Sequence, residues 1–188
     1  MKIVEHKIKK NKKEIILKLM TFNSSDEKIF KSTFQKYIKL NNILKNRLKA
    51  TRIMNFPDAL SESIFCYKMK CGKLLGASNA SGYSTSFDAY DPNREKRIQI
   101  KCSASSGPTS FGPRSEYDEI YFVDFKSDGL IDGSYKIYKL DNNDIDGVKV
   151  NKKHSLVDQQ KLDRRPRFEI RSQLINKKNL KPLIVGQL

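Results

Sequence analysis

The chain has 188 residues, of which 31% are charged and 38% are hydrophobic, and its formal net charge at pH 7 is +16. This length suffices for one domain with its own core. A membrane protein is not expected, because no apolar run approaches the roughly 20 residues that a spanning helix needs. A secretory signal is not expected either, because the first twenty residues lack a long apolar stretch.

The sequence offers few ligands for a transition metal. Cys66, Cys71 and Cys102 are odd in number, and we interpret them as reduced thiols of a cytoplasmic protein. The two histidines, His6 and His154, lie near opposite ends of the chain. Zinc sites use paired Cys or His at short spacings, so a zinc site is not predicted. HNH nuclease chemistry, which needs a histidine base, fits poorly for the same reason.

The positive charge is concentrated at the two ends of the chain. Residues 1–52 carry a balance of +11 and residues 149–188 a balance of +8, whereas residues 53–148 carry −3. Basic surfaces attract polyanions, and an acidic centre suits a divalent cation. We expect one domain over 1–188, with a basic helical region in 1–52, a core in 53–148 and a second basic segment in 149–188. The expected partner is a nucleic acid.

The first predicted elements are helices. Residues 2–20 are interpreted as a helix with Ile15, Ile16 and Leu19 as core contacts. A second helix is predicted to begin at Ser24 or Ser25 and to run to about residue 49, with a lysine-rich outer face.

A third helix is predicted within 55–72. Pro57 suits its first position, Asp58 suits its first turn, and Gly72 is expected to end it. A loop or an approach to a strand follows in 76–84.

The centre of the chain is predicted to form strands. Residues 84–103 fit two strands around a turn at 91–94, and the loop 105–115 follows. The nearly continuous apolar run 118–125 predicts a buried strand, and 134–140 alternates like another. A helix or arm is expected near the carboxyl end. The fold class is therefore α/β or α+β, with a mixed central sheet flanked by helices.

The hairpin around residue 91 carries the candidate chemistry. If residues 92–95 form the loop, Asp88 lies opposite Gln99 and Ser86 lies opposite Lys101. A carboxylate can hold Mg²⁺, a Gln oxygen and the backbone carbonyl of Ile100 are further ligands, and a lysine can stabilise the transition state of phosphodiester hydrolysis. The alternative interpretation is a polar cross-strand cluster that faces water.

The segment "SFDAYDPNREKRIQIKCS" resembles the active-site hairpin of the PD-(D/E)XK nuclease superfamily. The matching residues are Asp88, Gln99 and Lys101, and this chain has Gln where the common pattern has Glu. The resemblance implies a restriction-endonuclease-like fold and a helical acid near the metal, for which Glu62 is the match. The "PD" at 57–58 is interpreted as a helix start and not as part of the motif.

Within that superfamily the chain is most similar to small type II restriction endonucleases. The resemblance implies an Mg²⁺-dependent homodimer that cleaves double-stranded DNA at a specific sequence and needs no nucleotide cofactor. It also implies that 53–148 is the catalytic core and that 149–188 contacts DNA. The alternatives are a nuclease of the same superfamily that acts on damaged or branched DNA, and a DNA-binding protein without catalytic activity.

Arginines are the candidate DNA contacts, because arginine reads guanine through two hydrogen bonds. The chain switches from lysine to arginine in 163–171, although these side chains could instead pair with Asp163 and Glu169 or hold phosphate. The predicted DNA-binding residues are Arg114, Arg164, Arg165, Arg167 and Arg171.

Overall fold

The structure is a computed structural model that describes residues 1–10, 13–52, 54–78, 86–105, 107–113, 116–126 and 131–188. These residues form an eight-stranded sheet in the order β1-β2-β3-β4-β5-β7-β8-β10. Neighbouring strands are antiparallel except β5 and β7, which run parallel. The strands are β1 (Lys2–Lys10), β2 (Lys13–Thr21), β3 (Gly72–Ser78), β4 (Ala89–Asp91), β5 (Lys96–Ser103), β7 (Glu119–Asp124), β8 (Ser134–Leu140) and β10 (Ile184–Gln187).

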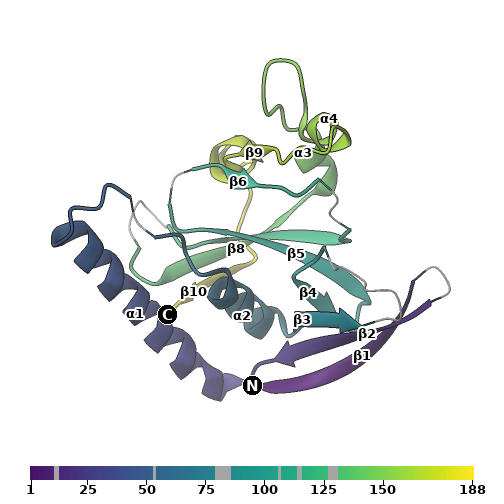
Figure 1. The fold of residues 1–188 in the computed structure, drawn as a ribbon, viewed down its shortest axis with the longest axis horizontal. Coiled ribbons are helices and arrows are strands. Elements are labelled where there is room, and N and C mark those ends of the chain that lie inside the picture. The colour runs from purple at the N-terminus through teal and green to yellow at the C-terminus, as the bar shows by residue number, and fades with distance from the viewer. Residues whose placement is uncertain (11–12, 53, 79–85, 106, 114–115, 127–130) are drawn as a thin grey trace.

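Helices and short segments cover both faces of this sheet (Figure 1). The helices α1 (Glu27–Asn46) and α2 (Asp58–Met69) pack on one face, against Ile98, Tyr121 and Val123. The other face carries α3 (Asn142–Asp146), α4 (Leu156–Lys161), β9 (Arg167–Phe168) and the π-helical segment η3 (Arg171–Asn176). The mixed sheet with flanking helices confirms the predicted α+β class. None of the helices in the described ranges is long and apolar enough to cross a membrane.

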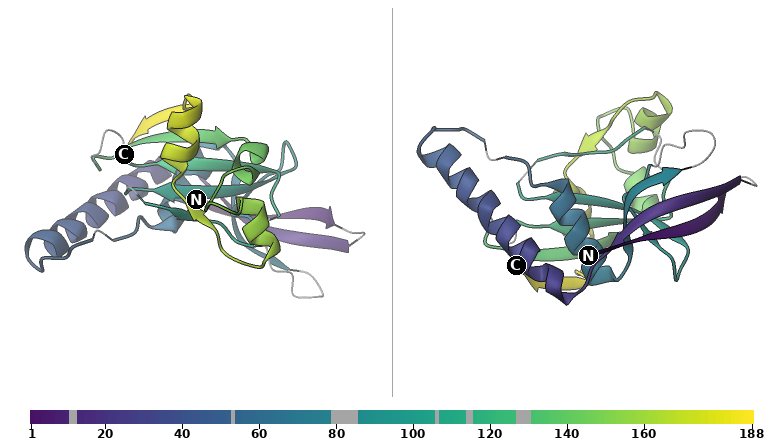
Figure 2. Two further views of the ribbon diagram at one scale, coloured as in Figure 1. Left: turned by 90° about the horizontal axis from the view of Figure 1, so that it is seen from above. Right: turned by 60° about the horizontal axis from the view of Figure 1, so that its bottom comes forward.

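The predicted helix over 2–20 is wrong, because these residues form the hairpin of β1 and β2. The buried side chains are Ile15, Leu17 and Leu19, which alternate along β2, while Ile16 is only half-buried. This period of two belongs to a strand with one buried face. The region 1–52 is therefore only partly helical, and β1 and β2 project from the body of the molecule (Figure 2).

The other two predicted helices are confirmed, with different ends. A short 3₁₀ turn, η1 (Ser24–Asp26), precedes α1, and its cap is Asn23, whose side chain accepts from the N–H of Ser25 at 2.9 Å. α2 ends at Met69 and not at Gly72, and its C-cap Lys70 adopts a left-handed φ of 55°. Gly72 instead begins β3, where an added Cβ would lie 2.9 Å from the Cβ of Leu19.

The predicted strands 118–125 and 134–140 are confirmed as β7 and β8, and β7 is buried along nearly its whole length. The carboxyl-terminal part is more varied than a helix or an arm. It contains α4, β9 and η3, and β10 pairs with β8 to complete the sheet. β9 pairs with β6 (Thr109–Ser110), which lies within the predicted loop 105–115.

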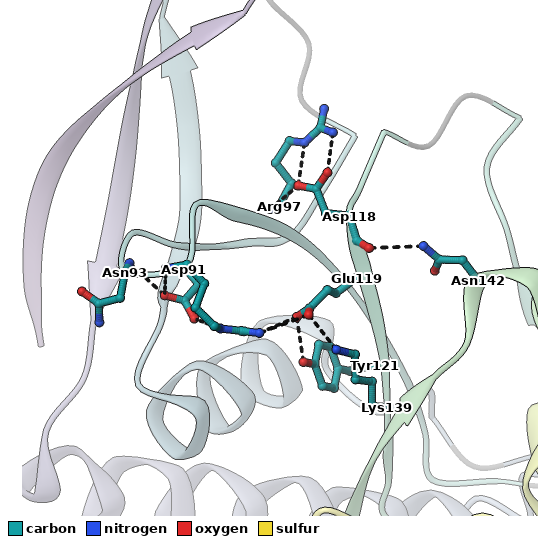
Figure 3. Close-up of polar contacts among 9 residues, drawn as sticks. Asp91, Asn93, Arg97, Asp118, Glu119, Tyr121, Lys139 and Asn142 are labelled. Atoms are coloured by element: carbon teal, nitrogen blue, oxygen red, sulfur yellow. Dashed lines mark hydrogen bonds and ion pairs between the residues drawn. The ribbon is translucent and has the colours of Figure 1, made fainter.

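A network of ion pairs fixes the turn between β4 and β5 to β7 (Figure 3). Arg94 in this turn lies 2.6 Å from Asp91 and 3.0 Å from Glu119. The Glu119 carboxylate also lies 2.6 Å from Lys139 Nζ and accepts from the Tyr121 hydroxyl at 2.8 Å. We call Glu119, Arg94, Lys139 and Tyr121 the Glu119 cluster.

Candidate active site

The site begins where β4 ends. β4 pairs with β5 over only three positions, Ala89↔Ile98, Tyr90↔Arg97 and Asp91↔Lys96, and this register is the predicted one. β5 continues to Ser103 with β7 as its neighbour on the other side. In the described residues, the edge of β5 that faces β4 is therefore unpaired by any strand beyond Ile98.

Asp88 occupies this open edge. Its carboxylate accepts from the backbone N–H of Ile100 at 2.6 Å and from Gln99 Nε2. The carbonyl of Ile100 leaves the strand on the same side as its N–H, so it also faces the open edge. The predicted meeting of Asp88 and Gln99 is confirmed. Ser86, predicted opposite Lys101, lies outside the strand pairing, and its hydroxyl accepts from the N–H of Glu116 at 2.6 Å.

A cavity of about 420 Å³ brings the predicted residues together. Its floor and sides include Glu62, Asp88, Gln99, Ile100 and Lys101. The remaining wall comes from residues 54–56, from Asp58, and from 102–105 and 107–110 at and after the end of β5. Four side chains and one carbonyl from separate parts of the sequence thus line one space.

Glu62 enters the cavity from α2 and is not a free acid. Its carboxylate lies 2.9 Å from Lys73 Nζ, which also donates to the carbonyl of Ala59 at 3.0 Å. Lys73 lies on β3, directly opposite Ala89 of β4, and is buried. No local sequence pattern points to Lys73, because its partner Glu62 is 11 positions away on another element.

Asp58 is a further carboxylate at the cavity that was predicted only as part of a helix start. It lies in the first turn of α2, as predicted, whereas Pro57 is the N-cap and not the first helical residue. Asp58 also lines the cavity. The thiol of Cys102 donates to its Oδ1 at 3.7 Å. Cys66, Cys71 and Cys102 are all free, as predicted.

The pKa values of Asp88 and Lys101 are both shifted in the direction that favours the neutral side chain. The pKa of Asp88 is raised to about 6, mainly by burial and also by the nearby Glu62 and Asp58, while the Ile100 N–H and Lys101 oppose the shift. Burial also lowers the pKa of Lys101, while Asp88 and Asp58 act to raise it. A buried carboxylate whose ionised form is held at a cost is well suited to receive a cation.

The cavity offers oxygen donors for a metal. Among the described residues no group of three or more His, Cys, Asp or Glu side chains could hold an ion. The available donors are instead the carboxylates of Asp88, Glu62 and Asp58, the amide oxygen of Gln99 and the carbonyl of Ile100. Such a set contains only hard oxygen ligands and fits Mg²⁺ better than a softer metal, although Glu62 would have to share its charge with Lys73.

The predicted DNA contacts separate into two groups. Arg164, Arg165 and Arg167 are exposed on the segment that leads into β9. Arg171 is engaged inside the protein: it lies 2.5 Å from Asp124 and donates to the carbonyls of Ser105 and Ser103 at 2.6 and 3.2 Å. Its contacts give it a structural role, and a DNA contact for it stays a prediction. Arg114 lies outside the described residues.

Comparison with known proteins identifies the family. The family model described as Bsp6I restriction endonuclease matches residues 22–177. The type II restriction enzyme Bsp6I of Bacillus sp. (strain RFL6) is 30% identical over 172 residues, which cover 86% of this chain and 91% of the relative. No solved structure was found to match. The matched range contains every residue that lines the cavity, and the chain belongs to the Bsp6I restriction endonuclease family.

Proposed function

We propose that the cavity at the end of β4 is the active site at which this type II restriction endonuclease hydrolyses a phosphodiester bond in each strand of a specific DNA site. Family membership makes the protein a site-specific deoxyribonuclease. One observation supports the placement of the site: Asp88, Gln99 and Lys101, which match the PD-(D/E)XK pattern, line one cavity together with Glu62. The sheet with helices on both faces is compatible with a restriction-endonuclease-like fold.

We propose Mg²⁺ as the cofactor, held by Asp88, the carbonyl of Ile100, Gln99 and Glu62. When bound, the cation polarises the phosphate and offsets the charge that develops on it. The protein's own groups do the rest. The Gln99 amide and the Ile100 N–H orient the Asp88 carboxylate. Lys101 places a positive charge beside the reacting phosphate, where it stabilises the transition state and orients the attacking water.

The basic surfaces supply the grip on DNA. We propose that the exposed Arg164, Arg165 and Arg167 approach the duplex beside the cavity, and that at least one of them contacts a base. The lysines along the exposed face of α1 are placed to hold the phosphate backbone. A homodimer with one active site for each strand is the assembly we expect, because a two-fold dimer matches a near-palindromic site.

A digest tests this function directly. The full chain is incubated with unmethylated plasmid, with and without Mg²⁺. We expect discrete fragments only when the cation is present, and the cut ends then give the recognition sequence. Cleavage restricted to branched or damaged DNA would support a repair nuclease instead. Retardation of DNA without cleavage at any divalent cation concentration would contradict the proposed activity.

A further inference from the structure

Phe111 connects the cavity to residues 164–168, which carry three exposed arginines: its ring contacts Lys101 on one element and Phe168 on the other. Phe111 follows β6 and is only 2% exposed. Its N–H donates to the carbonyl of Pro166 at 3.0 Å. Its ring stacks on that of Phe168, with centroids 4.8 Å apart and an interplanar angle of 6°. Phe168 belongs to β9 and is also buried. The backbone of Phe111 is therefore held by its hydrogen bond to Pro166, and its ring is held by stacking on Phe168.

The Lys101 ammonium rests over this ring. Lys101 Nζ lies 5.5 Å from the centroid of Phe111, within the range of a cation–π interaction. Asp88 and Asp58 attract Lys101 electrostatically and Arg165 repels it. Within the described part of the chain no carboxylate forms an ion pair with its ammonium. The flexible lysine side chain therefore has the aromatic ring as its direct support.

We propose that Phe111 is a positioning residue of the nuclease, whose ring holds the Lys101 ammonium in the place where it meets the reacting phosphate. This inference rests on the proposed role of Lys101 in the cavity. Catalysis depends on groups that are already oriented before the reaction, and a four-carbon lysine side chain loses that orientation easily. Because β9 carries Phe168 directly after Arg167, the segment proposed to contact DNA also supports the catalytic lysine.

The rate of one round of cleavage and the affinity for DNA separate this role from a structural one. Phe111→Leu and Phe111→Met remove the ring and keep an apolar side chain, whereas Phe111→Tyr keeps the ring. For a cation–π contact of ordinary strength, we expect the first two to slow single-turnover cleavage about 3- to 30-fold. We expect the dissociation constant for DNA to change less than about twofold, because the buried ring does not reach the duplex. Phe111→Tyr should cleave at close to the wild-type rate.

A control from the same core distinguishes positioning from loosening. Ile145 is fully buried in the same hydrophobic cluster, on α3. Ile145→Ala should lower the melting temperature, yet the folded protein should cleave at the wild-type rate when the assay is run well below that temperature. An equal loss of rate in Ile145→Ala and in Phe111→Leu would overturn the proposal, as would wild-type cleavage by both Phe111→Leu and Phe111→Met.

Lys101→Met separates this inference from the proposed function. If Lys101→Met cleaves normally, the active-site assignment itself fails. If Lys101→Met is inactive while the ring-free variants at Phe111 cleave normally, the assignment of the active site stands and only the positioning role is lost.

Discussion

Two carboxylates flank β5, Glu119 on β7 and Asp88 directly before β4, and their surroundings are opposite in charge. The Glu119 carboxylate forms ion pairs with Arg94 and Lys139 and accepts a hydrogen bond from the Tyr121 hydroxyl, all at 3.0 Å or less. At the cavity, the Asp88 carboxylate receives an amide and a backbone N–H, while its charged neighbours include the acids Glu62 and Asp58.

The pKa values record this difference. Burial alone would raise the pKa of Glu119, but its hydrogen bonds from Lys139, Tyr121 and Arg94 outweigh burial and lower it. The pKa of Asp88 is raised to about 6, by burial first and by the neighbouring acids Glu62 and Asp58 in addition. A carboxylate that the fold neutralises stabilises the fold. One that the fold leaves with unbalanced charge is a site for a cation that comes from outside.

The largest expected effect is on catalysis. Asp88→Ala and Lys101→Ala should each reduce cleavage by at least about 10³-fold, because each removes a group that we propose acts at the reacting phosphate. DNA retardation should remain close to wild type. The matched variant Glu119→Ala should keep its cleavage activity in the folded fraction. Full activity in Asp88→Ala, or loss of catalysis in folded Glu119→Ala, would invert the comparison.

The stability of Asp88 variants should depend on pH. The pKa of Asp88 is raised from 3.8 to about 6 by burial first, so between these values the folded state holds the proton more tightly than the unfolded state. The wild type therefore loses stability as pH rises through about 6, whereas Asp88→Asn does not. By pH 7.5, without divalent cations, we expect Asp88→Asn to be the more stable by up to about 3 kcal/mol.

Urea unfolding at pH 4 and at pH 7.5 measures this difference. A difference between the two proteins that stays constant with pH would show that the carboxylate is ionised at no cost. Cleavage by the wild type should rise over the same pH range, because only the ionised Asp88 holds a cation.

Arg165 lies outside both clusters and is exposed. If it reads a base, Arg165→Ala should cost about 1–3 kcal/mol of discrimination and relax the recognition sequence at one position. Digestion of a library of site variants gives this result. An unchanged set of cleaved sites would remove Arg165 from the proposed DNA contacts.

Gln99→Glu adds a negative charge to the cavity. We expect cleavage to continue and the Mg²⁺ concentration for half-maximal activity to fall about tenfold, since charged ligands hold the cation more tightly than neutral ones. A titration of activity against Mg²⁺ tests this. Folded but inactive Gln99→Glu would mean that the amide hydrogen bond to Asp88 is required.

The smallest effect concerns the neutralised cluster. Glu119→Gln should lower the free energy of unfolding at neutral pH by about 1–2 kcal/mol, because Arg94 and Lys139 are partly exposed and water takes over their charge. The loss should shrink as pH falls through the lowered pKa of Glu119 in the folded state, where the wild type also loses its charge. Denaturation at two pH values shows whether it does.

Local sequence patterns predicted the hairpin of β4 and β5, but they could not predict which distant segments pair with one another. The four-residue turn sets the register of β4 on β5, so the meeting of Asp88 with Gln99 follows from local sequence. In β2, the spacing of Ile15, Ile16 and Leu19 fits a helix as well as a strand, and only packing on β3 decides between them. Nothing local joins β6 to β9 or Lys73 to Glu62.

Asp58 shows a different limit. Its place at the start of α2 was predicted correctly, and that local explanation concealed its second position at the cavity. The contacts of Arg171 with Asp124, Ser103 and Ser105 could not be predicted for a related reason. An arginine in a basic segment suggests a DNA contact, and its partners inside the protein are distant in sequence.

The pairing of β6 with β9 and the contacts of Arg171 also set the order in which the enzyme can assemble. The carbonyl of Ser105, on the cavity wall, accepts a hydrogen bond from Arg171, which is synthesised 66 residues later. At about 5–20 residues per second, that interval is about 3–13 s of synthesis. Protease resistance of stalled nascent chains should rise in a step once these residues have emerged. A chain interrupted earlier contains every residue that lines the cavity, but Ser105 and β6 then lack the partners that hold them in place. We therefore expect an unfinished chain to cleave DNA poorly.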